Sequence, residues 1–394
     1  MSDERFLLTG ALGCIGAWVT RNLVIEGQRP VVFDRASDPR RLRLLMTDDE
    51  LAQVTFVAGD ITDLAALETA IDTHSITRII HLAALQVPFC RADPPGGARV
   101  NVVGTVNVFE AVARRKSQID KVVYASSAAV YDNADAGSDG GVAHGASGHP
   151  TTLYGVYKLA NEGTARVYQH EQGIASIGLR PYIVFGVGRD QGMTSAPTRA
   201  MLNAAAGRPF HIPYGGRADY HYADDVARAF IACARVPYSG AEIFNLRGSI
   251  ATMPQIIAAV EAVAPGARDL ITYDDKSLPF PETYDPAPLA ALLGHIPYTP
   301  LDAAVADTVT RFRELVARGA VQPDPYPAPP SAPPPVGTQH AASAPTRPTP
   351  RPPRHPSHPA SAPTRPTPRP PRHPYQSPIA STHIAVTHWF CIIL

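Results

Sequence analysis

The sequence has little that would tie it to an oxidising compartment or to a membrane. Its 394 residues include only four cysteines, which lie far apart and form no Cys-x-x-Cys pair. We therefore expect reduced thiols, and neither a disulfide framework nor a structural zinc site. The apolar runs stay below the roughly 18 residues that a membrane span needs, and the run before Thr9 is too short for a signal peptide. These absences predict a cytoplasmic protein with no membrane partner.

An excess of charge of either sign is also missing. The chain has 35 basic and 35 acidic side chains, and hence no formal net charge. Six arginines and one acid, Asp324, follow residue 320, which leaves +5 on the tail and −5 on the body. A mildly acidic body lacks the basic face of a nucleic-acid-binding protein, so we expect no nucleic-acid partner. No His, Cys or acidic cluster has metal-ligand spacing, and no metal is predicted.

Short apolar runs alternate with amphipathic stretches over most of the body. Strands that alternate with helices predict βαβ units, and therefore a parallel sheet with helices on both faces. The predicted fold is α/β, a Rossmann-type doubly wound parallel sheet. The expected strands span 6–8, 31–33, 55–57, 79–82, 122–125, 176–184 and 243–246, and the expected helices span 17–26, 64–74, 101–115, 154–172, 197–206, 224–234, 253–264 and 302–317.

After Gly186 the alternation loosens into a polar loop, a turn-rich segment at 210–219 and a Pro-rich stretch at 278–288. We expect this part to form a smaller C-terminal lobe that closes over a substrate. The predicted organisation is a Rossmann domain at 1–185 with 215–250 returning to it, a substrate-binding lobe at 186–214 and 251–320, and a tail at 321–394.

Proline dominates the end of the chain. Twenty-two of the 41 prolines lie in the last 72 residues, and the string SAPTRPTPRPPRHP occurs at 343–356 and again at 361–374. This composition cannot form a packed core, so we expect a disordered or polyproline-like tail. We favour a dispensable tail, and a basic tether for an acidic partner is the alternative. The last four residues match a CaaX prenylation box, but no lysine-rich stretch precedes it.

Three glycines follow the first predicted strand and open the first predicted helix. Gly10 permits a tight turn, Gly13 lets a pyrophosphate approach the backbone, and Gly16 allows close helix packing, while the helix N-terminus offers N–H groups to phosphates. Asp34 ends the second strand, where an acid accepts hydrogen bonds from the adenosine ribose and repels a 2′-phosphate. The 1–185 domain is therefore predicted to bind NAD rather than NADP, although Arg35 weakens that preference.

A second set of residues can transfer protons. Tyr154 and Lys158 lie four residues apart on a predicted helix and so share a face. An ammonium beside a phenol lowers the pKa of the phenol, which makes Tyr154 a usable general base near neutral pH. Ser127 ends a strand, at the edge where open parallel sheets bind ligands, and can orient a substrate oxygen. Together these residues can take the proton of a carbinol while its hydride leaves.

The sequence resembles the extended short-chain dehydrogenase/reductase family, the NAD-dependent sugar epimerase/dehydratase group. The matching segments are TGALGCIG (9–16), VVFD (31–34), GDITD (59–63), HLAA (81–84), NVVGTVNVFEA (101–111), YASSAAVY (124–131), YGVYK (154–158), LRPYIVFG (179–186) and DYHYADDVA (219–227). The resemblance implies catalytic roles for Ser127, Tyr154 and Lys158. It implies cofactor contacts from Gly10, Gly13, Cys14, Ile15, Gly16, Asp34, Asp60, Ile61, Leu82, Ala83, Ala84, Asn101, Tyr154, Lys158 and Tyr182. It also implies a homodimer formed through a four-helix interface.

The sequence departs from the family pattern at positions that bear on the substrate. Ala128 and Ala129 stand where sugar-nucleotide dehydratases carry an Asp-Glu pair, so dehydration is disfavoured. Ile183 and Ala218 stand where sugar-nucleotide epimerases carry an Asn and an Arg for the diphosphate. The substrate is then a free sugar, a sugar acid or another polyol, unless other residues of the small lobe supply the diphosphate contacts.

Two functions from different classes follow. The first is an enzyme that transfers a hydride between NAD and a carbinol of a sugar-like substrate, acting as an epimerase or as a dehydrogenase. The second is a non-catalytic NAD(P)-sensing protein on the same fold. The presence of Ser127, Tyr154 and Lys158 together favours the enzyme.

Overall fold

The computed structural model describes residues 4–138 and 140–325. The repeated proline-rich string, the CaaX-like end and nearly all of the predicted tail lie outside the described residues. The described residues belong to one compact unit.

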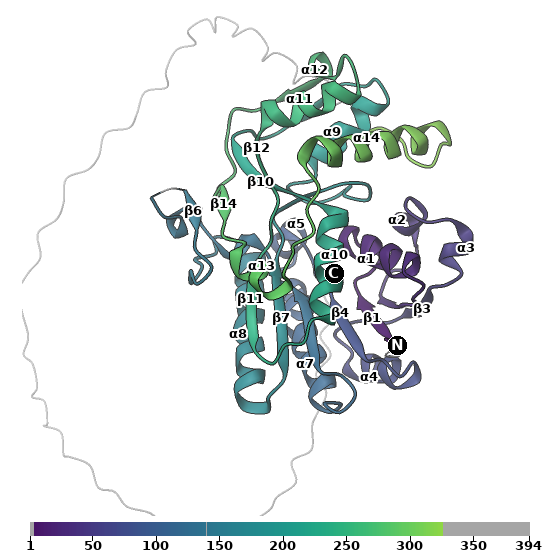
Figure 1. The fold of residues 1–394 in the computed structure, drawn as a ribbon, viewed down its shortest axis with the longest axis vertical. Helices are drawn as coiled ribbons and strands as arrows, with labels where there is room; N and C mark the ends of the chain where they lie inside the picture. The colour runs from purple at the N-terminus through teal and green to yellow at the C-terminus, as the bar shows by residue number, and fades with distance from the viewer. Residues whose placement is uncertain (1–3, 139, 326–394) are drawn as a thin grey trace, which may run out of the picture. The chain divides into compact units, whose positions relative to one another are not determined.

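A seven-stranded sheet forms the centre of the molecule (Figure 1). Its strand order is β11-β7-β5-β4-β1-β2-β3, and every neighbouring pair is parallel. The order reverses between β1 and β4, which is where doubly wound sheets open a crevice for a nucleotide. The strands are β1 (Phe6–Thr9), β2 (Val31–Asp34), β3 (Thr55–Ala58), β4 (Arg78–His81), β5 (Lys121–Ala125), β7 (Ala175–Arg180) and β11 (Ala241–Asn245).

Helices cover both faces of this sheet, as the alternation of the sequence predicts. Neighbouring strand residues point to opposite faces, so Leu8 belongs to the core under α1 and α10 and Leu7 to the core under α4, α7 and α8. The α/β, Rossmann-type prediction is confirmed. The covering helices are α1 (Cys14–Ile25), α4 (Leu64–Thr73), α7 (Gly104–Ala113), α8 (Leu153–Gln172) and α10 (Ala223–Arg235).

The single strand predicted at 176–184 is wrong. The chain forms β7 in the main sheet, bends at Pro181 and Tyr182, and continues as β8 (Ile183–Phe185) in a different sheet. Proline has no N–H for a strand ladder, so the bend falls where the ladder is interrupted. Pro181 is therefore the signal in the sequence that a single strand over 176–184 overlooks.

A second group of elements gathers at one end of the main sheet (Figure 1). A three-stranded sheet of β8, β10 (Arg217–Tyr222) and β12 (Ser249–Thr252) packs with helices α9 (Ala196–Ala205), α11 (Met253–Val263) and α14 (Leu301–Ala317). The segment 210–219, expected to be rich in turns, instead contains β9 (Phe210–Ile212) and the start of β10. The division into a Rossmann domain and a separate substrate lobe stays a prediction.

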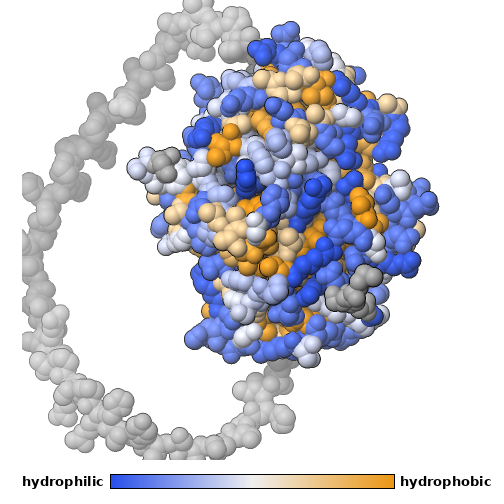
Figure 2. Space-filling view, in the orientation of Figure 1, coloured by the Kyte–Doolittle hydropathy of each residue, from blue (hydrophilic) through white to orange (hydrophobic). Residues whose placement is uncertain are grey.

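Short elements complete the fold. They are α2 (Arg40–Arg43), α3 (Asp48–Leu51), α5 (Val87–Ala92), α6 (Pro94–Ala98), a π turn (Arg99–Val103) that leads into α7, two 3₁₀ turns (Ala128–Val130 and Asn133–Asp135), β6 (Gly141–Val142), α12 (Ala267–Leu270), β13 (Ile271–Tyr273), β14 (Thr283–Tyr284) and α13 (Ala287–Leu293). Figure 2 shows that hydrophilic residues cover most of the face in view, with apolar residues in separate patches.

Candidate active site

The glycine loop between β1 and α1 is packed too closely for side chains. Gly10 has a φ of 69°, and a Cβ on it would lie 2.5 Å from the Cα of Ala83. A Cβ on Gly16 would lie 2.4 Å from the Cα of Ala11. A Cβ on Gly13 would meet only the Gly10 carbonyl oxygen of its own turn, at 3.2 Å. No side chain caps α1 at Gly13, so the first-turn N–H groups remain available to a phosphate.

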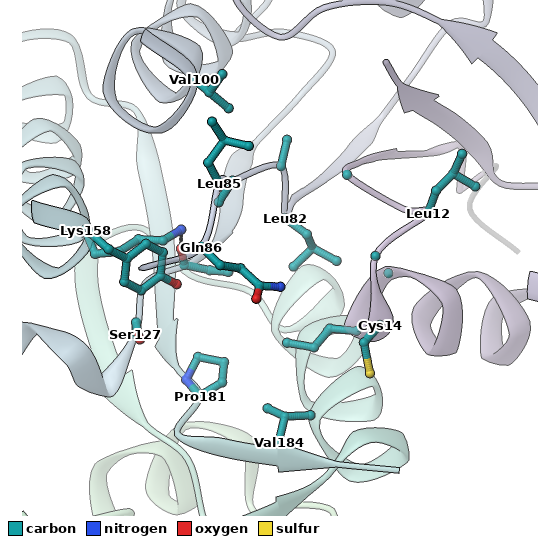
Figure 3. A pocket seen from close by; sticks show the side chains of 18 of the residues that line it. Leu12, Cys14, Leu82, Leu85, Gln86, Val100, Ser127, Lys158, Pro181 and Val184 are labelled. Carbon is teal, nitrogen blue, oxygen red and sulfur yellow. Dashed lines mark hydrogen bonds between the residues drawn. The ribbon is translucent and has the colours of Figure 1, made fainter. Parts of the chain in front are cut away.

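The loop forms one side of a pocket of about 420 Å³. The pocket runs from the end of β2 to the start of α8, and Figure 3 shows Leu12 and Cys14 on one side with Ser127 and Lys158 on the other. The pocket is lined by fifteen of the sixteen residues that were predicted to bind the cofactor or to take part in catalysis. They are Gly10, Gly13, Cys14, Ile15, Gly16, Asp34, Asp60, Ile61, Leu82, Ala83, Ala84, Ser127, Tyr154, Lys158 and Tyr182.

Asn101 is the exception. Its side chain is fully buried and bonds the loop after β4, accepting from the Leu85 N–H at 2.7 Å and donating to the Leu85 carbonyl at 2.9 Å. It also donates to the Cys90 sulfur at 3.4 Å. The structure therefore gives Asn101 the role of holding the pocket wall and does not place it in the lining.

Asp34 and Asp60 lie at the end of the pocket formed by β2 and by the segment after β3. The two carboxylate oxygens of Asp34 accept from the N–H groups of Leu12 (3.1 Å) and Ala36 (3.0 Å), which tie the glycine loop to the end of β2. Hydrogen bonds from Thr62, first from its backbone N–H, lower the pKa of Asp60 and keep it charged. Arg35 lines the same end.

Ser127 and Tyr154 are brought together by the close approach of two segments. Ser127 follows β5, and its hydroxyl accepts from the Ala129 N–H at 3.1 Å. Thr152 caps α8 by accepting from the Gly155 N–H at 3.1 Å, which places Tyr154 in the first turn. A Cβ on Gly155 would lie 2.1 Å from the Ala129 carbonyl oxygen, so only glycine lets α8 start this close to Ser127.

Lys158 lies one turn further along α8 and is 3% exposed. Its ammonium donates to the Ala125 carbonyl at 2.6 Å and lies 5.7 Å from the centroid of the Tyr154 ring. Burial lowers the pKa of Lys158 to about 8, against the weaker opposing effects of Cys90 and Glu162. The ammonium is thus held at the carboxyl end of β5, facing the pocket.

The pKa predicted for Tyr154 is wrong for this structure. Desolvation raises the pKa of Tyr154, and the partial relief comes from a hydrogen bond with Ser127 and from the charge of Arg189, without a contribution from Lys158. The helical spacing correctly puts Tyr154 and Lys158 on one face, but the ammonium points to Ala125 and not to the phenol oxygen. The sequence does not reveal that direction.

Two further polar residues line the pocket and were not singled out in the sequence. Figure 3 shows Gln86 reaching toward the middle of the pocket. Gln86 Oε1 and Arg189 Nε are buried and have no hydrogen-bond partner among the described residues, while Arg189 Nη2 donates to Thr194 at 3.1 Å. Gly192 lies against both, since a Cβ there would be 2.2 Å from Gln86 Oε1 and 3.2 Å from Arg189 Nη2. The only sequence signal is a basic residue in the polar loop after β8.

A buried ion pair links the end of β7 to α8 beside the site. Arg180, at the end of β7, donates to both carboxylate oxygens of Glu162 on α8, at 2.8 and 2.6 Å. Ser126 donates to the same carboxylate, and Arg180 also bonds the Tyr131 hydroxyl. Because all of its members are partnered, the network holds α8 against the strand end beside Ser127.

Over 4–138 and 140–325, no helix is both long and apolar enough to span a membrane. In the same residues, no three His, Cys, Asp or Glu side chains come together as a metal site would require.

The pocket fits a dinucleotide. Its glycine loop leaves room for phosphates where side chains would clash, an acid stands at the ribose position, and apolar residues such as Ile61 and Leu82 form walls for flat rings. NAD would be held by the α1 N-terminus, by Asp34 and by Lys158.

Comparisons with known proteins agree with this geometry. The model of the NAD dependent epimerase/dehydratase family matches residues 6–246. UDP-glucose 4-epimerase of Mycolicibacterium smegmatis is 31% identical over 320 residues, which cover 78% of this chain and 98% of that protein. UDP-glucuronate 4-epimerase 5 of Arabidopsis thaliana is 31% identical over 232 residues, 56% of this chain, and the match spans only 52% of that relative.

A solved structure shows the same fold. UDP-glucose 4-epimerase of Thermus thermophilus, in complex with NAD, superposes with a TM-score of 0.66 at 24% identity, covering 78% of this chain and 99% of that one. Since the family model matches more than half of the sequence and a relative 31% identical is covered almost end to end, this chain belongs to the NAD-dependent epimerase/dehydratase family.

Proposed function

We propose that the protein transfers a hydride between NAD and a carbinol of a sugar, sugar acid or nucleotide sugar, as an epimerase or a dehydrogenase. The observation that carries the proposal is the convergence of Ser127, Tyr154 and Lys158 on the pocket that the glycine loop opens. Bound NAD supplies the hydride acceptor. The chain itself must bind the carbinol, orient it and remove its proton.

The three side chains divide this work. Tyr154 takes the hydroxyl proton in its phenolate form, and the raised pKa of its phenol means that this form needs support in the complex. Ser127 is hydrogen-bonded to Tyr154 and orients the substrate oxygen whose proton Tyr154 takes. The Lys158 ammonium, held by Ala125 and facing the pocket, would hold the nicotinamide ribose and add positive charge on the face of helix α8 that carries Tyr154. The product of the step is a ketone, either re-reduced in place or released.

Dehydration is disfavoured in this proposal. The residues after Ser127 are Ala128, which is buried, and Ala129, which lines the pocket, and neither can carry a proton. Loss of water from a keto intermediate needs an acid and a base beside the substrate. The chain offers neither at these positions.

The pocket also favours a substrate with an anionic group. The charge of Arg189 partly offsets the raised pKa of both Tyr154 and Cys14, so it acts on both the catalytic end and the glycine loop. Its unpartnered Nε and the Gln86 oxygen are costly to bury unless a ligand pairs with them. A carboxylate or phosphate with a neighbouring hydroxyl satisfies both groups. The epimerases of UDP-glucose and UDP-glucuronate among the relatives act on substrates of this kind.

We also propose a homodimer through α7 and α8, which pack side by side. Val156 and Val167 on α8 and Val103 before α7 are 45%, 50% and 46% exposed, which is unusual for such apolar side chains. Val156 and Val167 are three helical turns apart on α8 and so share one face, which a second copy can cover.

The test is a screen of free sugars, aldonic and uronic acids, and nucleotide sugars. Turnover by dialysed protein that still carries NAD indicates the epimerase, and strict dependence on added NAD indicates the dehydrogenase. The sensing protein remains the alternative because the same pocket can bind a dinucleotide without turnover. Wild type and Tyr154→Phe would then bind NAD equally and be equally inactive across the whole screen.

A further inference from the structure

A buried acid–histidine pair lies beneath the pocket wall and takes no part in the proposed proton transfer. Asp219 and His221 are both on β10 and are 3% and 1% exposed. His221 Nε2 lies 3.2 Å from Asp219 Oδ2, and His221 Nδ1 accepts from the backbone N–H of Tyr182 at 3.3 Å. The imidazole therefore joins a carboxylate on one side to a peptide of the pocket wall on the other.

The hydrogen bond fixes the tautomer of the ring. Since Nδ1 accepts a hydrogen bond from the backbone N–H of Tyr182, the proton of the neutral ring is on Nε2, facing the carboxylate. Nε2 and Asp219 Oδ2 are close enough for an ion pair but are not aligned as a hydrogen bond, so the carboxylate borders the ring on the side opposite Tyr182. Gly248 closes over the pair, because a Cβ there would lie 2.2 Å from Asp219 Oδ1 and 2.3 Å from His221 Cδ2.

Tyr182 lies at the bend where the chain leaves the seven-stranded sheet for the three-stranded one. Its ring lines the pocket and meets Phe280 and Tyr284 edge-on, with centroids 6.0 and 5.4 Å apart. Pro181 and Val184, on either side of it in sequence, are on the same wall in Figure 3. These ring contacts limit tilting, while the hydrogen bond from the Tyr182 N–H to His221 fixes where the side chain starts.

We propose that Asp219 and His221 are a positioning pair that holds the Tyr182 peptide, and through it the pocket wall facing the hydride-transfer site. The proposal rests on the proposed function for its catalytic consequence. A wall displaced by a fraction of an ångström misplaces the reacting atoms and lowers the rate of turnover, while the glycine loop still binds the cofactor.

The test uses two substitutions of His221 by amide side chains, each of which replaces a different nitrogen of the ring. His221→Asn places an oxygen at the position of Nδ1 and keeps an acceptor for Tyr182, whereas His221→Gln reaches only the position of Nε2. We expect faster amide hydrogen exchange in the peptide containing Tyr182 for His221→Gln, and near-wild-type exchange for His221→Asn. We also expect kcat to fall about 10- to 100-fold for His221→Gln alone, with the NAD dissociation constant unchanged.

Asp225→Asn is the matched control for a merely structural loss. Asp225 is also a buried carboxylate, next to β10, and it accepts from the N–H and hydroxyl of Thr299 at 2.6 and 2.8 Å. This variant should lower the melting temperature without changing exchange at Tyr182 or kcat. Equal amide hydrogen exchange at Tyr182 in the two His221 variants would overturn the proposal. Losses of kcat that simply follow the melting temperatures of the variants would overturn it too. A wild type that is inactive on every substrate counts against the proposed function instead. In that case the difference in amide exchange between His221→Gln and His221→Asn alone tests the positioning role of the pair.

Discussion

The buried position of Lys158 lowers the free energy of unfolding. A buried ammonium whose pKa is about 8, below its ordinary 10.5, holds its proton less well in the folded state than in the unfolded chain. Its burial therefore opposes folding below pH 8, and this cost fades as the pH rises from about 8 to about 10.5. Such a cost is typical of groups that a protein keeps for function.

We expect Lys158→Met to unfold less readily than wild type at neutral pH. The gain should be on the order of 1–3 kcal/mol, since the variant removes a buried charge and keeps the volume. Urea unfolding at about pH 7 and about pH 10 measures it, and the gain should shrink at the higher pH. A variant less stable than wild type at both pH values would show that the bond to Ala125 outweighs the cost of burial.

Arg189 provides the second test at this scale. Arg189→Met should raise the KM of an anionic substrate by about tenfold or more, because one charged hydrogen-bond partner is lost. Titration of NAD by fluorescence should give an unchanged dissociation constant. Arg40, which pairs with Asp190 outside the pocket lining, provides the control variant Arg40→Met with neither effect. Weaker NAD binding by Arg189→Met would instead assign the guanidinium to the pyrophosphate.

At the scale of elements, the start of α8 decides whether the site forms. Gly155→Ala should lower stability by about 1–3 kcal/mol and abolish most turnover, because its Cβ would push the helix away from Ala129. A Cβ on Gly163, on the same helix, would meet nothing within 4 Å, so Gly163→Ala should raise stability by up to about 1 kcal/mol and keep activity. Circular-dichroism melts and turnover together check the pair. Equal effects of the two substitutions would mean that the close approach at Gly155 is not needed.

The elements also show what the sequence can and cannot predict. The other expected strands, the glycine loop and the shared face of Tyr154 and Lys158 follow from local periodicity and spacing, and the structure has them, whereas the single strand expected at 176–184 is wrong. Pro181 marks the break between β7 and β8, but the move of β8 into another sheet does not follow, because the local pattern does not show which strands pair. The bonds of Asn101 and the direction of the Lys158 ammonium depend on partners that only the tertiary fold brings close.

At the scale of the whole molecule, the exposed apolar face of α7 and α8 is the feature that a single copy leaves unexplained. We expect wild type to have the mass of a dimer by light scattering, and Val156→Arg to shift it toward a monomer, because a charge would be buried against the second copy. Ile250 on β12 is 45% exposed, as Val156 is, so Ile250→Arg is the matched control and should keep the wild-type mass. A monomeric wild type would rule the interface out.

The central claim is that Tyr154, as a phenolate hydrogen-bonded to Ser127, removes the carbinol proton beside NAD. Single-turnover formation of NADH by wild type and by Tyr154→Phe, with NAD affinity measured on the same samples, tests it most directly. We predict unchanged NAD affinity and hydride transfer at least about 100-fold slower in the variant. Hydride transfer at the wild-type rate in Tyr154→Phe would contradict the account.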